Sequence, residues 1–469
     1  MSKLVSDLFD ISEFAHHGPE NLFISLIKII GSFIFLFLIN WRLAIPLLVL
    51  VVFMLLFSYG QNKKMQATFM DNRRKIGDVN SSLQDTLAGI RVVQSFANEE
   101  IEREKFRKSN QGFLRSKDAN YKCMGSFMSG NLFFQGMMYL VTLVFGGWLI
   151  AHGKMEAADL AMYALYIGIF ISPIQILVEL TEMMQKGLSG FRRFLDVVET
   201  EPEIVNAPDA ESIDEVNGHV SYENVSFHYS DDDTPVLSNV TFDIPAGKSV
   251  ALVGPSGSGK TTICSLLPRF YDVTAGKITL DGVDIRNLSL AELRDEIGFV
   301  PQKGILFSGT IASNLKFGRP EATEAEMTEA AEIAQATEFI NEKPEKYDSG
   351  IAQGGPNVSG GQKQRLSIAR AIAKNPNVYI FDDSFSALDM KTDAALRRAL
   401  ETKTEHTTVI IVAQRISTIL HADQILVLDD GKIVGKGTHE ELLHNCEVYE
   451  QIARSQLSAK ELGLSEEVK

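Results

Sequence analysis

The hydrophobic residues of this chain are concentrated before about residue 185. They form four long runs, at about 22–40, 43–60, 122–151 and 159–180. A helix needs about 20 apolar residues to cross the hydrocarbon core of a bilayer. Buried helices of a large soluble core would give similar runs, but the first two runs meet at a break of only three residues, Asn40 to Arg42. The pattern therefore predicts four transmembrane helices, the first two forming a membrane hairpin.

A long polar stretch, residues 61–120, separates the second and third runs. It contains no proline and keeps helical spacing, so we predict helical extensions of both spans, with Gly60 and Gly112 as weak interruptions. Its clustered basic residues contrast with the short turns at 40–42 and 152–158, which carry few. The positive-inside tendency predicts that this stretch is cytoplasmic. An ordinary solvated helix face would also explain most of these basic residues.

The remaining chain divides by composition. Residues 196–216 form an acidic linker, in which Val197–Val216 carries seven acidic residues, two prolines and no basic residue, and we predict an exposed connector. From 217 to 455 the pattern changes to short strands and helices, which is typical of an α/β domain. The polar tail at 456–469 is expected to carry no chemistry.

Composition narrows the function. The 469 residues include 45 Lys+Arg and 60 Asp+Glu, a net charge of −15, which argues against binding to duplex nucleic acid. The three cysteines lie far apart, which excludes a disulfide framework or a zinc motif and fits a reducing cytosol. Residues 1–10 lack a basic n-region and an apolar h-region, so no cleaved signal peptide is predicted.

One motif of the second domain indicates phosphate chemistry. The strand 250–253 leads into Gly-Pro-Ser-Gly-Ser-Gly-Lys-Thr-Thr and then an apolar helix, which is a P-loop in its required setting rather than a chance glycine-rich turn. Backbone N–H groups of the loop would surround the phosphates, Lys260 would reach the β- and γ-phosphates, and the Thr261 hydroxyl would bind Mg²⁺. The nucleotide-binding residues are predicted to be Gly254, Pro255, Ser256, Gly257, Ser258, Gly259, Lys260, Thr261 and Thr262.

A second strand, Val378–Asp382, has four apolar residues followed by a carboxylate. Such strands are common, but together with a P-loop this one predicts that Asp382 holds Mg²⁺ through water. Upstream of it, Val-Ser-Gly-Gly-Gln-Lys-Gln-Arg at 358–365 resembles the signature motif of ATP-binding cassette (ABC) transporters. The resemblance implies that a partner's ATP contacts the signature residues Ser359, Gly360, Gly361 and Gln362.

Further residues match that family in the expected order. Tyr229 resembles the aromatic residue that stacks on adenine, Gln302 the glutamine that senses Mg²⁺ and the membrane domain, and Asp389 the D-loop aspartate. Taken singly, Tyr229 could be a strand tyrosine, Gln302 a surface amide, and Ser359-Gly360-Gly361 a helix N-cap with turn glycines. The resemblance covers the whole chain and implies a multi-domain protein: an α-helical transmembrane bundle followed by an α/β P-loop nucleotide-binding domain.

The chain also departs from the family, which places six membrane helices before each cassette. Only four are predicted here, so residues 1–195 are interpreted as a partial transmembrane domain. By resemblance, residues 1–20 match the end of the first cytoplasmic loop. The alternative is a natural four-helix protein. Residues 96–100 match a coupling helix that docks on the partner's cassette. Residues 351–357 differ from the acidic segment that often precedes the signature in this family. How this segment contacts the coupling helices is therefore left open.

Two departures affect the expected catalytic residues Asp383, Gln414 and Gln302. Asp383 stands where the family has a glutamate that polarises water; its carboxylate lies back by about 1 Å, and misplacement on that scale can cost about 10²-fold in rate. Gln414 stands where the family has a histidine that contacts the γ-phosphate, and an amide cannot carry a proton. We therefore expect this chain's own P-loop site to be slow or inactive.

The resemblance is to the degenerate-site subunit of bacterial heterodimeric multidrug exporters. It implies ATP and Mg²⁺ as cofactors, a multi-pass location in the bacterial cell membrane with the cassette in the cytoplasm, and an exported small-molecule substrate. The expected partner is a second half-transporter with an intact glutamate and histidine and an altered signature. The alternative is a membrane-tethered ATP-binding regulatory subunit or a non-transporting fragment with little turnover; the four spans exclude soluble cassette ATPases.

The substrate is not readable from the sequence, and drugs, lipids and peptides all stay open. Lys28, inside the first span, fits either a functional charge or a side chain that snorkels to the interface. Six aromatic and methionine residues fit either a promiscuous cavity or a surface facing lipid and neighbouring helices. They are Phe127, Met128, Phe133, Phe134, Met137 and Met138.

Overall fold

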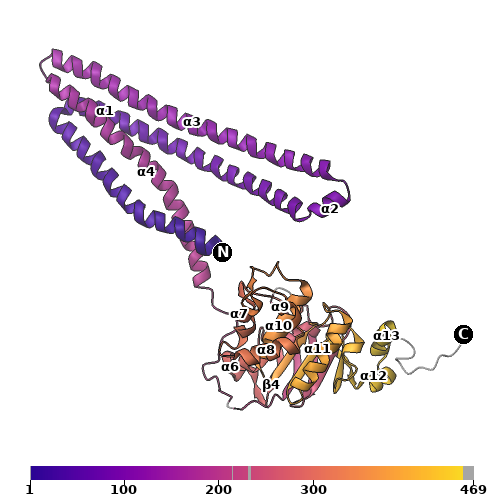
Figure 1. The fold of residues 1–469 in the computed structure, drawn as a ribbon. Helices are drawn as coiled ribbons and strands as arrows, with labels where there is room; N and C mark the ends of the chain where they lie inside the picture. The colour runs from indigo at the N-terminus through magenta and orange to yellow at the C-terminus, as the bar shows by residue number, and fades with distance from the viewer. Residues whose placement is uncertain (1, 214, 231–233, 458–469) are drawn as a thin grey trace. The chain divides into compact units, whose positions relative to one another are not determined.

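The computed structural model describes residues 2–213, 215–230 and 234–457. The chain divides into two compact units, Met1–Glu201 and Pro202–Lys469, and each is described by itself. The first unit is helical and the second is built from α-helices and β-sheets (Figure 1). The expected polar tail at 456–469 lies outside the described residues except for its first two positions.

The helical unit contains α1 (Ser2–Ala88), α2 (Ile90–Ser95), α3 (Glu99–Ala151) and α4 (Ala157–Val198). The long α1 is interrupted at Asn40, whose backbone angles of φ −156° and ψ 96° are not helical, and the chain reverses direction there (Figure 1). The first two apolar runs therefore form a hairpin. Helix α1 continues through Gly60 and α3 through Gly112, so these two glycines do not interrupt the helices, contrary to the prediction.

Polar side chains tie the break in α1 to the turn between α3 and α4. The Asn40 amide donates to the Lys154 carbonyl at 2.8 Å, and its oxygen accepts from the Arg42 N–H at 3.1 Å. The fully buried Tyr163 hydroxyl lies 2.6 Å from the Leu36 carbonyl oxygen and 2.7 Å from that of Asn40. A helix break leaves backbone groups without helical partners, and in an apolar setting these side chains satisfy them.

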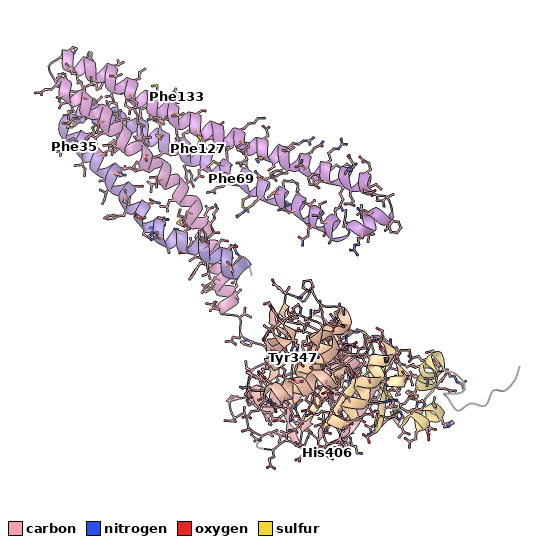
Figure 2. The ribbon with its side chains drawn as sticks, viewed as in Figure 1. Phe35, Phe69, Phe127, Phe133, Tyr347 and His406 are labelled. Atoms are coloured by element: carbon pink, nitrogen blue, oxygen red, sulfur yellow. The ribbon has the colours of Figure 1, made fainter. Side chains whose placement is uncertain are left out.

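The exposure of the helices favours membrane spans over a soluble core. Helices α1 and α3 are long and apolar enough to cross a membrane, while the apolar part of α4, Ala157–Pro173, is shorter. Only 17% and 22% of the most apolar windows of α1 and α3 are buried, whereas core helices of a soluble protein would be covered. Figure 2 shows Phe35 and Phe133 among these side chains.

The six aromatic and methionine residues of α3 that were weighed as a cavity lining do not share one environment. Met138 is completely buried, whereas Phe133 is 63% exposed and Met128 is 55% exposed. Phe134 is partly buried against the apolar core of the unit. At least two of the six therefore face outward from this unit rather than into its core.

The described residues of the second unit form three sheets. A four-stranded sheet has the order β2-β1-β4-β5, a six-stranded sheet the order β12-β11-β3-β10-β9-β6, and β7 pairs with β8. The strands are β1 (Val220–Phe227), β2 (Leu237–Ile244), β3 (Ser249–Val253), β4 (Ala275–Leu280), β5 (Val283–Asp284), β6 (Ile297–Val300), β7 (Gly309–Thr310), β8 (Gly350–Ile351), β9 (Val378–Asp382), β10 (Thr408–Val412), β11 (Gln424–Asp429) and β12 (Lys432–Gly437).

Helices pack around these sheets in two groups. Helices α7 to α9 share an apolar core with α10, whereas α5, which follows the P-loop, packs in a different core. Helices α12 and α13 pack beside β11 and β12. The α-helices are α5 (Lys260–Leu266), α6 (Leu290–Asp295), α7 (Ile311–Leu315), α8 (Glu324–Ile333), α9 (Thr337–Asn341), α10 (Gly360–Lys374), α11 (Met390–Lys403), α12 (His439–Asn445) and α13 (Glu447–Gln456).

The register of the six-stranded sheet positions the site. Strand β10 is parallel to both β3 and β9, and Val412 pairs with Leu252 on one side and with Asp382 on the other. The three strands therefore end side by side. The loops that follow them leave from the same edge, where ligands of such sheets bind.

The acidic linker is only partly the exposed connector that was predicted. Helix α4 continues to Val198, inside the predicted linker. Further along, the Glu211 N–H donates to the Asn287 carbonyl at 2.7 Å, and Ile213 and Val216 pack partly buried against the core of the second unit. These two apolar side chains, scattered among acidic ones, attach the end of the linker to the α/β unit.

Candidate functional site

The loop between β3 and α5 has the backbone that phosphate binding requires. Gly254, Gly257 and Gly259 all have positive φ angles, of 155°, 82° and 97°. A Cβ on Gly254 would lie 2.0 Å from the Leu428 carbonyl oxygen, so no other residue fits there. The loop ends at the N-terminus of α5, where free N–H groups favour an anion.

Lys260, the first residue of α5, folds back over this loop. Its Nζ lies 2.9 Å from the Gly254 carbonyl oxygen, 2.6 Å from that of Pro255 and 3.1 Å from the Ser258 hydroxyl. Burial lowers the pKa of the lysine, and two nearby carboxylates oppose that change. The ammonium is thus held at the loop as a charge that can pair with phosphate oxygens.

Thr261 and Asp382 bring two oxygen atoms together beside the loop. The Thr261 hydroxyl donates to Asp382 Oδ1 at 2.9 Å, and the Asp382 side chain is almost completely buried. Burial, together with the neighbouring Asp383, raises the pKa of Asp382, while the bond from Thr261 and the Lys260 charge act in the opposite direction. Hard oxygen donors in a carboxylate-rich position fit Mg²⁺, so these residues suit the expected metal.

Three residues from separate loops meet at one carboxylate oxygen. Asp383 Oδ2 accepts a hydrogen bond from the Gln302 amide at 3.0 Å and a second from the Gln414 amide at 2.6 Å. Asp383 itself is buried and has a left-handed backbone, with φ 48°. The structure therefore brings together all three residues expected to take part in catalysis, and the carboxylate is already engaged by two amides.

These groups line one cavity of about 540 Å³ at the edge of the six-stranded sheet. Its walls include most of the P-loop, Gln302, both aspartates and Gln414. Two further residues, Ile452 and Gln456, come from α13 near the end of the described chain. The sequence had assigned them no role.

Tyr229 lies at the outer side of the P-loop helix. Its hydroxyl is 3.1 Å from the Thr262 hydroxyl, and 37% of the residue is exposed, which leaves surface for a base to stack on. The ring of Tyr271 stands nearly perpendicular to it, at 88° and 5.2 Å between centroids. The sequence analysis did not single out Tyr271. The adjacent aromatic residues Phe270 and Tyr271, shortly after the P-loop helix, could have indicated it.

The signature residues lie at the start of α10. Ser359 caps this helix, its hydroxyl accepting from the Gln362 N–H at 3.3 Å while the Gln362 side chain accepts from the Ser359 N–H at 2.9 Å. A Cβ on Gly360 would meet nothing within 4 Å. These residues do not line the P-loop cavity, so within one described chain the two groups form separate surfaces.

Asp389 likewise begins a helix. Its carboxylate accepts from the N–H groups of Lys391 at 3.1 Å and Thr392 at 2.9 Å, and the bonds at Thr392 contribute most to lowering its pKa. Ser359 is thus the helix N-cap that its sequence also allowed, and the structure shows a second N-cap at Asp389. Capping does not exclude a second role toward nucleotide.

Comparison with known proteins decides the family. Residues 1–174 match the ABC transporter transmembrane region, and residues 237–386 match the ABC transporter domain. YwjA, an uncharacterized ABC transporter ATP-binding protein of Bacillus subtilis (strain 168), is 38% identical over 456 residues, covering 97% of this chain and 79% of YwjA. The chain belongs to the ABC transporter family.

Other members are also similar to this ABC transporter chain. The ATP-dependent lipid A-core flippase of Syntrophus aciditrophicus (strain SB) is 35% identical over 475 residues, covering 100% of this chain and 77% of the flippase. A Staphylococcus aureus (strain NCTC 8325) protein, provisionally named a multidrug export ATP-binding/permease protein, is 33% identical and covers 96% of this chain and 78% of its own length. The structure of a bacterial Atm1-family ABC exporter with ATP bound superposes with a TM-score of 0.79 and 27% identity, covering 96% of this chain and 81% of that one.

These matches confirm the predicted family and fold class: a helical transmembrane region followed by an ABC nucleotide-binding domain. They identify an ABC-type exporter subunit with an ATP-binding domain. The roles of individual residues stay predictions.

Proposed function

We propose that this ABC transporter chain is one subunit of a heterodimeric exporter and that its own P-loop site hydrolyses ATP slowly. The observation that carries this proposal is the state of Asp383. Its carboxylate is one methylene shorter than a glutamate, and one of its oxygens is occupied by the amides of Gln302 and Gln414. A general base must have a free lone pair within reach of the proton it removes. Here one oxygen is taken by two amides, and the other sits on a side chain that is one methylene shorter than a glutamate, which supports slow hydrolysis.

The same chain keeps the parts that bind nucleotide. The P-loop, Lys260 and the Thr261–Asp382 pair fit MgATP, and the signature glycine Gly360 is open to approach. In the proposed dimer, this signature completes a working site on the partner's P-loop. The partner then supplies the glutamate and histidine that this chain lacks.

The membrane part supports a location in the bacterial cell membrane with several spans, the nucleotide-binding domain lying in the cytoplasm. Similarity to proteins named for multidrug export and lipid A-core flipping supports a lipophilic substrate. The engaged Asp383 also favours a second candidate, a membrane-tethered subunit that binds ATP and regulates without turning it over.

Three measurements test the proposal. The full chain purified in detergent should bind MgATP and hydrolyse it well below the 1–10³ s⁻¹ typical of good enzymes. Purification from native membranes should yield a second ABC half-transporter, and vesicles containing both should accumulate substrate with ATP. Fast turnover by the chain alone would refute the slow-site assignment. A chain that binds MgATP, but whose native complex neither hydrolyses ATP nor transports, would favour the regulatory candidate.

A further inference from the structure

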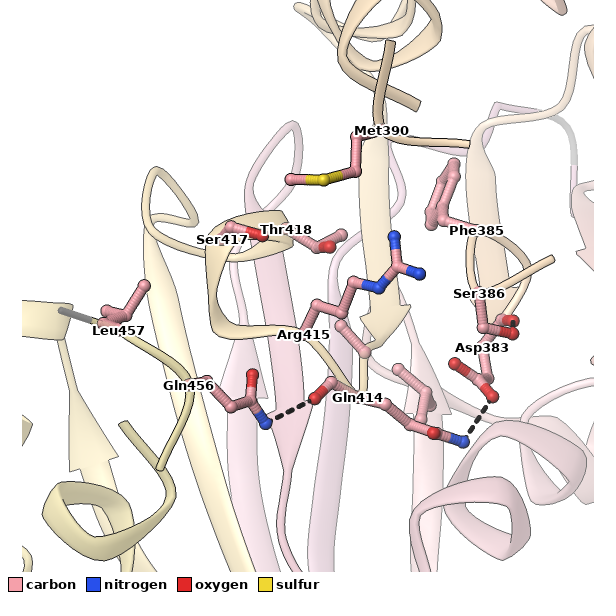
Figure 3. Close-up of a pocket in the computed structure, with 12 residues that line it drawn as sticks. Asp383, Phe385, Ser386, Met390, Gln414, Arg415, Ser417, Thr418, Gln456 and Leu457 are labelled. Atoms are coloured by element: carbon pink, nitrogen blue, oxygen red, sulfur yellow. Dashed lines mark hydrogen bonds between the residues drawn. The ribbon is translucent and has the colours of Figure 1, made fainter. Parts of the chain in front are cut away.

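Gln456, the last residue of α13, makes two hydrogen bonds to the backbone of the loop that carries Gln414. Its amide nitrogen donates to the Gln414 carbonyl oxygen at 2.8 Å, and its amide oxygen accepts from the Ile416 N–H at 2.8 Å. Figure 3 shows the first bond beside the contact between Gln414 and Asp383. The two bonds lie on either side of Arg415, so one side chain fixes three consecutive residues of the loop.

The pair of bonds demands an amide of this length. One bond uses a donor and the other an acceptor, which a glutamine supplies and a glutamate or lysine does not. At the start of the loop, the Ala413 N–H makes a long hydrogen bond to the Leu252 carbonyl oxygen, at 3.4 Å. At its end, the Arg397 guanidinium donates to the Ser417 carbonyl oxygen at 2.6 Å. Gln456 holds the middle, where Gln414 projects.

Helix α13, which carries Gln456, is anchored by buried apolar side chains. Tyr449 and Ala453 are completely buried and share an apolar cluster with Ile416 and Ile419 from the loop region. Gln456 also lines the same cavity of about 540 Å³ as the P-loop and Gln414. The helix therefore connects directly to the part of the site opposite the phosphate-binding loop.

We infer that Gln456 is a positioning residue: it places the Gln414 amide against the terminal phosphate of bound ATP and so favours ATP over ADP. This inference rests on the proposed nucleotide site. Gln456 bonds to none of the described P-loop residues, whereas it holds residue 414, which the family resemblance places at the γ-phosphate and which lines the same cavity as the P-loop. Displacing the loop that carries Gln414 should therefore weaken only the binding of a nucleotide with a third phosphate.

The test uses the full chain in detergent and two probes, Mg·ADP and the non-hydrolysable analogue Mg·AMP-PNP. Gln456→Met keeps the side-chain volume and removes both hydrogen bonds. The control is Gln451→Met on the same helix, where the exposed glutamine amide bonds, among the described residues, only to Glu447, at 3.2 Å. Gln456→Met should weaken AMP-PNP binding about three- to tenfold, the scale of one neutral hydrogen bond, and leave ADP binding within about twofold. Gln451→Met should match wild type.

The AMP-PNP to ADP affinity ratio is measured on one sample, so an unfolded fraction does not alter it. An unchanged ratio in Gln456→Met, or an equal loss for both nucleotides, would overturn the inference, since the second result describes a purely structural role. If the wild-type chain bound neither nucleotide, the proposed function itself would fail. The two failures are thus distinguishable.

Discussion

Asp383→Glu is expected to convert the slow P-loop site into a faster one. The substitution adds one methylene and moves the carboxylate toward the cavity that the P-loop also lines. Errors of about 1 Å in the placement of a reacting group can cost about 10²-fold, and a general base contributes about 10²–10⁴-fold. Because Gln302 and Gln414 still compete for the carboxylate, we expect a gain in turnover at or below the lower end of these ranges, about 10- to 100-fold.

Phosphate release from the purified full chain measures this gain. Two copies of the chain can assemble a site, because each carries both a P-loop and a Ser-Gly-Gly-Gln signature. Asp382→Asn, which removes the expected Mg²⁺ ligand, gives the background from contaminating ATPases. Asp383→Asn keeps the side-chain size and removes the charge; if the aspartate is not an effective base, turnover should change by less than about threefold.

Two results would contradict this reasoning. A loss of more than about tenfold in Asp383→Asn would show that the aspartate already acts as the base. No gain in Asp383→Glu, with nucleotide affinity unchanged, would show that the length of residue 383 does not limit the reaction. Adding Gln414→His to Asp383→Glu should raise turnover further, since it removes one competing amide.

Three further outcomes follow from other contacts. Lys260→Met should weaken MgATP binding at least about tenfold, because charge-assisted bonds to phosphate are lost; equilibrium nucleotide binding measures this, and similar affinity would contradict it. Gly360→Ala should leave the unfolding midpoint of the chain unchanged, as no atom lies within 4 Å of the new Cβ, yet strongly reduce turnover of the complex with its partner. Asn40→Ala should destabilise the chain in detergent by roughly 1–2 kcal/mol, because it loses bonds to Lys154 and Arg42; an unchanged thermal midpoint would refute this.

Some of this structure could be predicted from short stretches of sequence. The P-loop is continuous, and its glycines, lysine and threonine determine the loop from within, so its position between β3 and α5 followed directly. The helix break at Asn40 followed in the same way from two apolar runs that meet at three residues.

Contacts between distant segments could not be predicted in this way. Gln302, Asp383 and Gln414 come from three separate loops, and only the parallel register of β9 and β10 and the pairing of β6 with β9 bring those loops together. Sequence reasoning named the three residues by resemblance, but not their shared carboxylate oxygen. Gln456 was assigned to a tail without chemistry because its partners are backbone atoms 40 and 42 positions away, which leave no trace in side-chain pattern.

The bonds from Asn40 to Lys154 and Arg42 have a mechanical consequence. The first bond joins the reversal in α1 to the α3–α4 turn, and the second lies within the reversal, so one end of the helical unit is tied together (Figure 1). Helix α3 has 53 residues, which at 1.5 Å per residue makes a lever about 80 Å long. A tilt of about 5° at the tied end would carry the other end of α3, beside α2, through about 7 Å. A small rearrangement at the tied end would therefore produce a large displacement at the far end of the helix.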